Sequence, residues 1–138
     1  MQRRNILAAT AAVLAAAFVP AHAQDKWPTK PITYVVPFGA GGTTDVLARL
    51  ITPKVATALG TTFVIENKAG AGGSMGSDFT AKAAPDGYTI QGGTISSHAI
   101  NASLYAKLPY DPIKHFQPIT RLGSMPTILV VRADSPYK

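Results

Sequence analysis

The chain has 138 residues, enough for one modest domain, and 46% of them are hydrophobic. It contains no cysteine, which excludes disulfides and thiolate metal sites. The formal net charge is +6, but after Arg3 and Arg4 the basic residues are dispersed singly. A nucleic-acid-binding protein would instead carry a basic stripe with stacking aromatic residues, so we expect no nucleic-acid partner.

The first 23 residues have the pattern of an export signal. Arg3 and Arg4 form a positive start, and the apolar stretch 6–19 is shorter than the ~20 residues of a membrane-spanning helix. Residues 21–23 (AHA) have the small-x-small form of a signal-peptidase site, which predicts a mature start at Gln24. No cysteine follows this site to carry a lipid. The alternatives are a retained membrane anchor and, given the arginine pair, twin-arginine export.

The rest of the chain is organised around one stretch, ITYVVPFGAGGTTDVLARL, which begins at Ile32. Its β-branched run 32–36 predicts a buried strand and its glycine-rich segment 39–42 predicts a turn. The apolar spacing that follows predicts a helix over about 44–59 that ends at Gly60. Pro53 falls inside this span and predicts a kink or two pieces. A glycine turn before a helix N-terminus presents unpaired N–H groups to an anion.

The pattern then repeats. A strand over 61–66 precedes a second glycine loop at 70–73, and Ser74 is expected to cap a helix that reaches about residue 84. A third strand is expected over 88–95, with residues 96–98 (SSH) at its carboxyl end. Alternating strands and helices predict an α/β fold, a parallel sheet with flanking helices. Such sheets bind ligands beyond the carboxyl ends of their strands, where these three loops would converge.

The last third of the chain is less regular. A short helix is expected over 100–105, and the three prolines of 108–118 indicate a surface loop. Residues 121–131 contain one or two expected strands around Pro126.

The first glycine loop has a partial match to a dinucleotide fingerprint. Gly39 and Gly41 supply two glycines, Thr44 stands at the third position, and Glu66 lies where a ribose-binding acid belongs. An NAD-type oxidoreductase half-domain is therefore the main alternative function. Export and the second glycine loop count against it, and no Gly-Lys-Ser/Thr follows to bind a nucleoside triphosphate. A glycine turn without any ligand is the other alternative.

Signs of catalysis are weak. Residues 72–76 (GGSMG) satisfy the G-x-S-x-G pattern of a hydrolase elbow, which keeps an exported esterase using Ser74 as an alternative. That elbow needs a strand running directly into the serine, and residues 68–71 intervene. Ser97 and His98 are chain neighbours, which usually point apart, so no catalytic pair is expected. The histidines show no metal-ligand spacing. We expect no enzyme, cofactor or metal.

Charged residues near the first loop have modest expected roles. Thr43, Thr44 and Asp45 suit the N-cap and first turn of the helix, where Asp45 would favour the helix dipole. Arg49 and Arg121 are expected to be solvated rather than to contact a ligand. The other carboxylates form no evident acid–base couple.

Three segments together resemble a known family. They are PITYVVPFGAGGTTDVLAR, VIENKAGAGGSMGSDFTAKAAPDGYTI and SSHAINASLYAKLPYDPIKHFQPIT, which cover nearly all of residues 31–120. The chain resembles the Bug receptors, the periplasmic solute receptors of tripartite tricarboxylate transporters. It departs from the family at Ala40, where many members have proline, and at His115, where aspartate is common.

The resemblance implies a two-lobed, type-II-like binding protein that closes on a small di- or tricarboxylate in the periplasm. It implies the transporter's integral membrane subunits as partners and a monomeric receptor. Residues 24–122 would be the N-terminal portion of the first lobe, and 123–138 a crossover towards a second lobe that is missing. Because members are more than twice as long, we expect this truncated lobe alone to bind ligand weakly or not at all.

The resemblance also implies ligand-binding residues on the three loops, with backbone amides and hydroxyls donating to a carboxylate. They are Phe38, Gly39, Gly41, Gly42, Thr43, Thr44 and Asp45 on the first loop, Ala71, Gly72, Gly73 and Ser74 on the second, and Ser96, Ser97 and His98 on the third.

Overall fold

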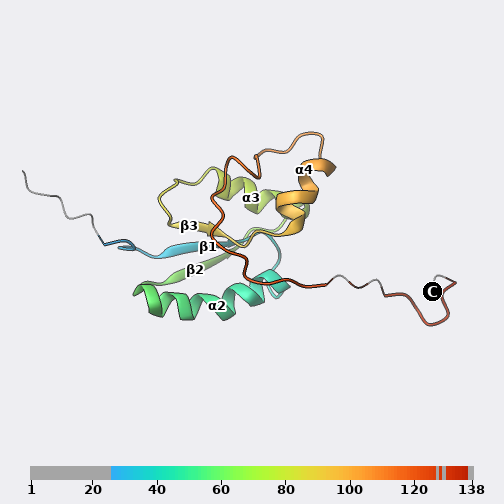
Figure 1. Ribbon diagram of the computed structural model, residues 1–138, viewed down its shortest axis with the longest axis horizontal. Helices are drawn as coiled ribbons and strands as arrows, with labels where there is room; N and C mark the ends of the chain where they lie inside the picture. The colour runs from blue at the N-terminus through green and yellow to red at the C-terminus, as the bar shows by residue number, and fades with distance from the viewer. Residues whose placement is uncertain (1–25, 127, 129, 137–138) are drawn as a thin grey trace, which may run out of the picture.

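The computed structural model describes residues 26–126, 128 and 130–136 (Figure 1). The predicted export signal and its cleavage site lie outside these residues. Strands and helices alternate along the described chain, as the sequence predicts. None of the helices in this part of the chain is long and apolar enough to cross a lipid bilayer.

Three parallel strands form a sheet in the order β2-β1-β3 (Figure 1). β1 (Ile32–Val36) has the predicted bounds and lies between β2 (Phe63–Asn67) and β3 (Thr89–Gln91). β2 is displaced by one or two residues from its predicted bounds. β3 is shorter than predicted: after the Gly92 N–H donates to the carbonyl of Val35 at 3.0 Å, the chain leaves the sheet and becomes helical.

The core lies around β1, whose side chains are covered on both faces. Val35 and Val36 are fully buried, and Tyr34, Val36 and Ala48 form one buried cluster. A strand enclosed on both faces consists of continuous apolar residues rather than alternating ones, which explains why the run was recognisable from the sequence. The residues packed against this cluster are Phe38, Phe63, Ile65 and Ile90.

α2 (Thr43–Leu59) covers one side of the sheet (Figure 1). It is one continuous helix, so the predicted division at Pro53 does not occur, although the proline ring removes one helical hydrogen bond. The helix ends as predicted at Gly60, which has a left-handed φ of 65° and donates its N–H to the carbonyl of Ala56.

α3 (Ser74–Ala81) and α4 (Asn101–Leu104) lie on the other side (Figure 1). The N-cap of α3 is Gly73, and no side chain makes a capping bond there. The prediction that Ser74 caps this helix is therefore wrong. α3 also ends earlier than predicted: the N–H of Ala83 donates to the carbonyl of Thr80 at 3.1 Å, an i→i−3 bond that tightens the last turn.

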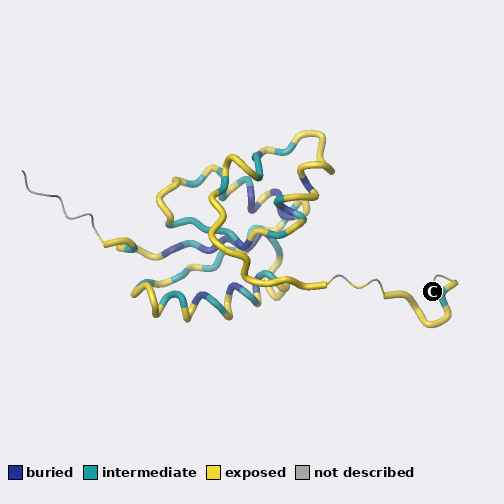
Figure 2. Tube along the Cα trace, viewed as in Figure 1, coloured by how far each residue is buried: buried dark blue, intermediate teal, exposed yellow. Residues whose placement is uncertain are grey.

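The described residues of 121–131 contain no strand, which corrects the prediction made for them. Residues 121–126 are exposed along their whole length (Figure 2). A strand exists only where its backbone is paired with a neighbour, and we find no backbone hydrogen bond between these residues and the sheet. Pro126 also lacks the N–H that a strand would use.

Candidate functional site

The three predicted loops meet at Gly73. A Cβ atom built on Gly73 would lie 3.1 Å from Cζ of Phe38, on the first loop, and 3.3 Å from Cβ of Ser97, on the third. Gly73 has a φ of 91°, a conformation that residues with side chains rarely adopt. Glycine is therefore needed here for its backbone geometry and for its size, and it lets the three loops come together at one edge of the sheet.

The first loop is closed by its own backbone and by Asp45. The Gly42 N–H donates to the carbonyl of Gly39 at 3.3 Å, and the Gly41 N–H donates to Oδ2 of Asp45 at 2.8 Å. Gly42 is the N-cap of α2, without a side-chain capping bond, so Thr43 and Thr44 do not cap the helix as predicted. Instead, Asp45 reaches back from the first turn to the loop.

Asp45 is buried, with an exposed fraction of 3%, and it belongs to a cluster with Arg49 and Asn67. Nη2 of Arg49 lies 3.0 Å from Oδ1 of Asp45, and Nδ2 of Asn67 donates to the same oxygen at 3.0 Å. Arg49 remains half-exposed, as expected, but its pairing with Asp45 was not predicted from the sequence. The role of Asn67 was not predicted either; the only signal in the sequence was an amide residue closing the second strand.

These contacts hold the pKa of Asp45 far below the usual range of an aspartate. The hydrogen bond from Arg49 is the largest cause, followed by those from the Gly41 N–H and from Asn67, and together they outweigh the opposing effect of burial. The same pairing raises the pKa of Arg49. Asp45 is therefore ionised in the folded protein at any physiological pH.

The depressed pKa of Asp45 predicts a pH-dependent contribution to stability. A carboxylate whose pKa falls on folding stabilises the protein above its unfolded pKa, about 3.9, and loses this effect as the pH falls below that value. Unfolding in urea between pH 7 and pH 3 should therefore show a stability gap between the wild type and Asp45→Asn that narrows below about pH 4. An equal gap at both pH values would contradict the prediction. Asp134→Asn, at an exposed carboxylate, controls for general charge effects.

The second loop has an unusual backbone. Gly70, Ala71, Gly72 and Gly73 have φ values of 145°, 45°, 61° and 91°, and Ala71 is the one among them with a side chain. The N–H of Gly73 donates to the carbonyl of Gly70 at 3.0 Å. Four successive residues of this kind reverse the chain between β2 and α3, which explains why glycines dominate the segment.

Asn101, a buried residue of α4, holds this loop and was missed by the sequence reasoning. Its Nδ2 donates to the carbonyl of Gly72 at 2.9 Å and to Oγ of Ser74 at 3.0 Å. Ser74 is therefore a buried acceptor for an asparagine rather than a helix cap. A short 3-10 turn, Ala71–Gly73, precedes Ser74 instead of a strand, so the geometry of a hydrolase elbow is not formed.

The third loop is helical. Residues Ser96–Ile100 form a π-type turn before α4, and Oγ of Ser97 lies 2.9 Å from Nδ1 of His98. The expectation that these neighbours point apart is wrong. Ser97 is nevertheless fully buried, and its Oγ also accepts the N–H of Thr94 at 3.1 Å. Its hydroxyl is thus held inside the turn, where it stabilises the loop.

Aromatic residues of the following segment support the third loop. The Tyr110 hydroxyl donates to the carbonyl of Ser97. The His98 ring packs edge-on against Phe116, with ring centroids 4.7 Å apart. Burial lowers the pKa of His98, so its imidazole is neutral near pH 7. In this state it presents hydrogen-bonding nitrogens without a full charge.

The remaining predicted site residues follow the rim of the sheet. Thr44 packs against Gly92, the residue that follows β3: a Cβ atom built on Gly92 would lie 2.8 Å from Cγ2 of Thr44. Glu66, the candidate ribose acid, is paired with Lys68 at 3.0 Å. Within the described residues, no three histidine, aspartate or glutamate side chains are grouped to hold a metal. The exposed members of the predicted set are Gly39, Gly41, Gly42, Thr43, Ala71 and Gly72.

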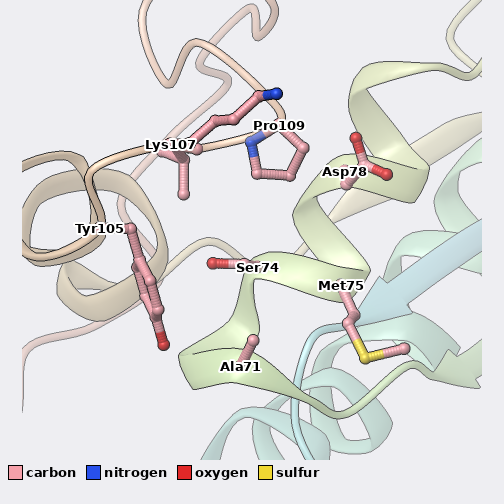
Figure 3. Close-up of a pocket in the computed structure, with 8 residues that line it drawn as sticks. Ala71, Ser74, Met75, Asp78, Tyr105, Lys107 and Pro109 are labelled. Atoms are coloured by element: carbon pink, nitrogen blue, oxygen red, sulfur yellow. The ribbon is translucent and has the colours of Figure 1, made fainter.

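A small cavity of about 210 Å³ opens beside the second loop (Figure 3). Ala71 and Ser74 line it from the loop and the start of α3, and Tyr105 and Lys107 line it from the segment after α4 (Figure 3). Most of its other lining residues are apolar. Only the second loop, among the three, contributes residues to this cavity, so the cavity is distinct from their meeting point at Gly73.

The sequence profile of the tripartite tricarboxylate transporter family receptor matches residues 47–138, more than half of the chain. The chain belongs to this family. BugT of Bordetella pertussis is 38% identical over 132 residues, which cover 94% of this chain and 40% of BugT. The UPF0065 protein in the tcbD-tcbE intergenic region of Pseudomonas sp. strain P51 is 38% identical to this chain. The match covers 99% of this chain and 40% of the length of that protein. This Bug-family chain thus spans about 40% of the length of these relatives.

Solved structures agree. MatC from Rhodopseudomonas palustris, with bound malate, is 46% identical to this chain, with a TM-score of 0.64. The match covers 67% of this chain and 31% of the MatC chain. The periplasmic binding protein BugD is 42% identical, with the same two coverages and a TM-score of 0.61. An R. palustris protein with adipate is 46% identical over 62% of this chain and 29% of its own, with a TM-score of 0.60. The predicted Bug-type α/β fold of a periplasmic binding protein is confirmed.

Proposed function

We propose that this Bug-family chain forms the carboxylate-binding rim of an exported, non-enzymatic receptor for a tripartite tricarboxylate transporter. The observation that carries the proposal is the meeting of three loops at Gly73, at the carboxyl edge of a parallel sheet. Relatives of the same fold bind malate and adipate, which supports a small dicarboxylate as the ligand. The transporter's membrane subunits are the proposed partners, and the receptor is proposed to be a monomer.

The first loop supplies the donors in this proposal. The first-turn amides of α2 have no acceptor within the helix, and the helix dipole favours a negative charge beside them. The Gly41 N–H is already engaged by Asp45, so the amides and hydroxyls of Thr43 and Thr44 are the proposed contacts from this loop. Charge-assisted hydrogen bonds of this kind hold a carboxylate without any chemistry.

Residues 24–122 are the proposed portion of the first lobe, and 123–138 the proposed crossover to a second. Exposed apolar residues in the crossover, such as Met125 and Val130, are consistent with a segment that packs against further structure. We expect residues 24–138 by themselves to bind weakly, because closure around a ligand needs contacts from both sides. Micromolar dicarboxylate binding by this piece in a calorimetric titration would contradict that expectation.

The function is tested by thermal-shift and calorimetric titration of the protein as its own cells export it. A panel of malate, adipate, citrate, an amino acid and NAD separates the alternatives. We expect stabilisation by a carboxylate and none by NAD. Retention on an NAD column, or labelling of Ser74 by a fluorophosphonate, would overturn the proposal in favour of the oxidoreductase or the esterase. The intact mass of the same protein tests cleavage after Ala23.

A further inference from the structure

Both oxygens of the buried Asp45 carboxylate, under the first loop, accept hydrogen bonds from surrounding donors. Oδ2 of Asp45 accepts the N–H of Gly41 at 2.8 Å and Nε of Arg49 at 3.0 Å. Oδ1 of Asp45 lies 3.0 Å from Nη2 of Arg49 and accepts Nδ2 of Asn67 at 3.0 Å. Each oxygen therefore has two donors, one of them from the guanidinium, which is the forked geometry that only arginine provides.

The cluster fixes the loop at both of its ends. Asn67, the last residue of β2, also donates through Nδ2 to the carbonyl of Phe38 at 3.2 Å, and its Oδ1 accepts Nη2 of Arg49 at 3.3 Å. The carbonyl of Phe38 begins the loop and the N–H of Gly41 lies near its end. The loop is thus hydrogen-bonded at one end to Asn67 of the sheet and at the other to Asp45 in the first turn of α2.

Arg49 also neutralises the negative charge of Asp45. Asp45 carries its negative charge in the same turn whose amides would receive an anion, and an uncompensated carboxylate there would repel that ligand. Arg49 is half-exposed but touches both oxygens of Asp45, so the pair is neutral as seen from the loop. Repulsion from an uncompensated Asp45 would grow with the charge of the ligand.

We infer that Asp45 and Arg49 are a positioning pair, in which Asp45 removes Gly41 from the set of ligand donors and Arg49 makes the loop tolerant of doubly charged ligands. The inference rests on the proposed function, because it takes the first loop to be a contact for the ligand carboxylate. Neither side chain touches the ligand in this account. Both act through the backbone of the loop and through the field around it.

The test compares the wild type with Arg49→Met and Arg49→Lys, each produced in and exported by the cells that make the native protein. The probes are malate, with two carboxylates, and the monoamide of malate, with one. Arg49→Met should weaken malate binding by about tenfold, the scale of repulsion between unit charges near a protein surface, because Asp45 would then be uncompensated. It should weaken binding of the singly charged monoamide clearly less, and added salt should narrow the difference. Arg49→Lys should restore the malate-to-monoamide ratio. Lys54→Met, an exposed charge loss on the same helix, should leave both affinities unchanged.

A second readout needs no ligand. The amide of Gly41, which donates to Asp45, should exchange with solvent more slowly than that of Gly39 in the wild type, and Asp45→Ala, which removes the acceptor, should abolish the difference. Equal losses for both probes in Arg49→Met, independent of salt, would reduce the arginine to a structural role and overturn the inference. So would an unprotected Gly41 amide. Failure of the wild type to bind either probe would instead overturn the proposed function, together with the ligand part of this inference.

Discussion

Gly76→Ala is expected to destabilise the protein by about 2 kcal/mol, although alanine is the better helix former. Gly76 lies inside α3, where replacing glycine with alanine ordinarily gains about 1 kcal/mol. Here, a Cβ would lie 2.7 Å from Cα of Pro37 and 2.9 Å from the carbonyl oxygen of Lys68. Both are backbone atoms that cannot rotate away, and overpacking of this kind costs about 3 kcal/mol. The steric cost therefore outweighs the gain in propensity.

Urea unfolding of Gly76→Ala beside Gly39→Ala measures this effect. Gly39 has no atom within 4 Å of the position of a new Cβ, and its φ lies outside the left-handed region, so its replacement should be nearly neutral. A Gly76 variant as stable as the wild type would show that α3 can move away from the end of β1. In that case the close packing of α3 against Pro37 and Lys68 would not be required.

Asn101→Ala is expected to cost about 2 kcal/mol and to loosen the second loop. The substitution removes the donor that serves both the carbonyl of Gly72 and the buried Oγ of Ser74. Leaving a buried acceptor without a partner costs about 1–3 kcal/mol. The exposed carbonyl of Gly72 can turn to water, whereas the buried Oγ of Ser74 cannot do so without opening the loop.

Urea unfolding and amide exchange measure the two parts of this prediction. The Gly73 N–H, which donates to Gly70 within the loop, should lose protection in Asn101→Ala. Ser103→Ala changes an exposed position of the same short helix and is expected to have no effect on either measurement. Full protection of the Gly73 amide in Asn101→Ala would mean that the glycine loop holds its shape without the asparagine.

Asn67 and Asn101 play equivalent structural roles. Asn67 ties the first loop to the end of β2, and Asn101 ties the second loop to α4. Each side chain serves more than one partner, and each joins segments that are far apart in the sequence. The rim is thus held by side chains behind it, while the backbone in front stays accessible. This arrangement suits a site that binds through amides.

β1, the end of α2 at Gly60 and the positions of both glycine loops could all be predicted from the sequence. These features depend on local rules. The enclosed strand is a continuous β-branched run, a helix ends where a glycine can adopt positive φ, and loop backbones of this kind require glycine. The family was also visible at this level, because three long segments matched in the same order.

The contacts of the side chains at the rim became visible only in the folded structure. The Ser74 hydroxyl accepts a hydrogen bond from Asn101, Ser97 contacts His98 inside a π-type turn, and the half-exposed Arg49 pairs with Asp45. The partner of Ser74 lies 27 residues away in the chain, so no periodicity or local propensity contains it. The contact between Asn101 and Ser74 exists only once the fold brings α4 beside the second loop, whereas Asp45 and Arg49 are one helical turn apart and Ser97 and His98 are chain neighbours. Local sequence sets which elements form, and packing sets which polar groups they leave free.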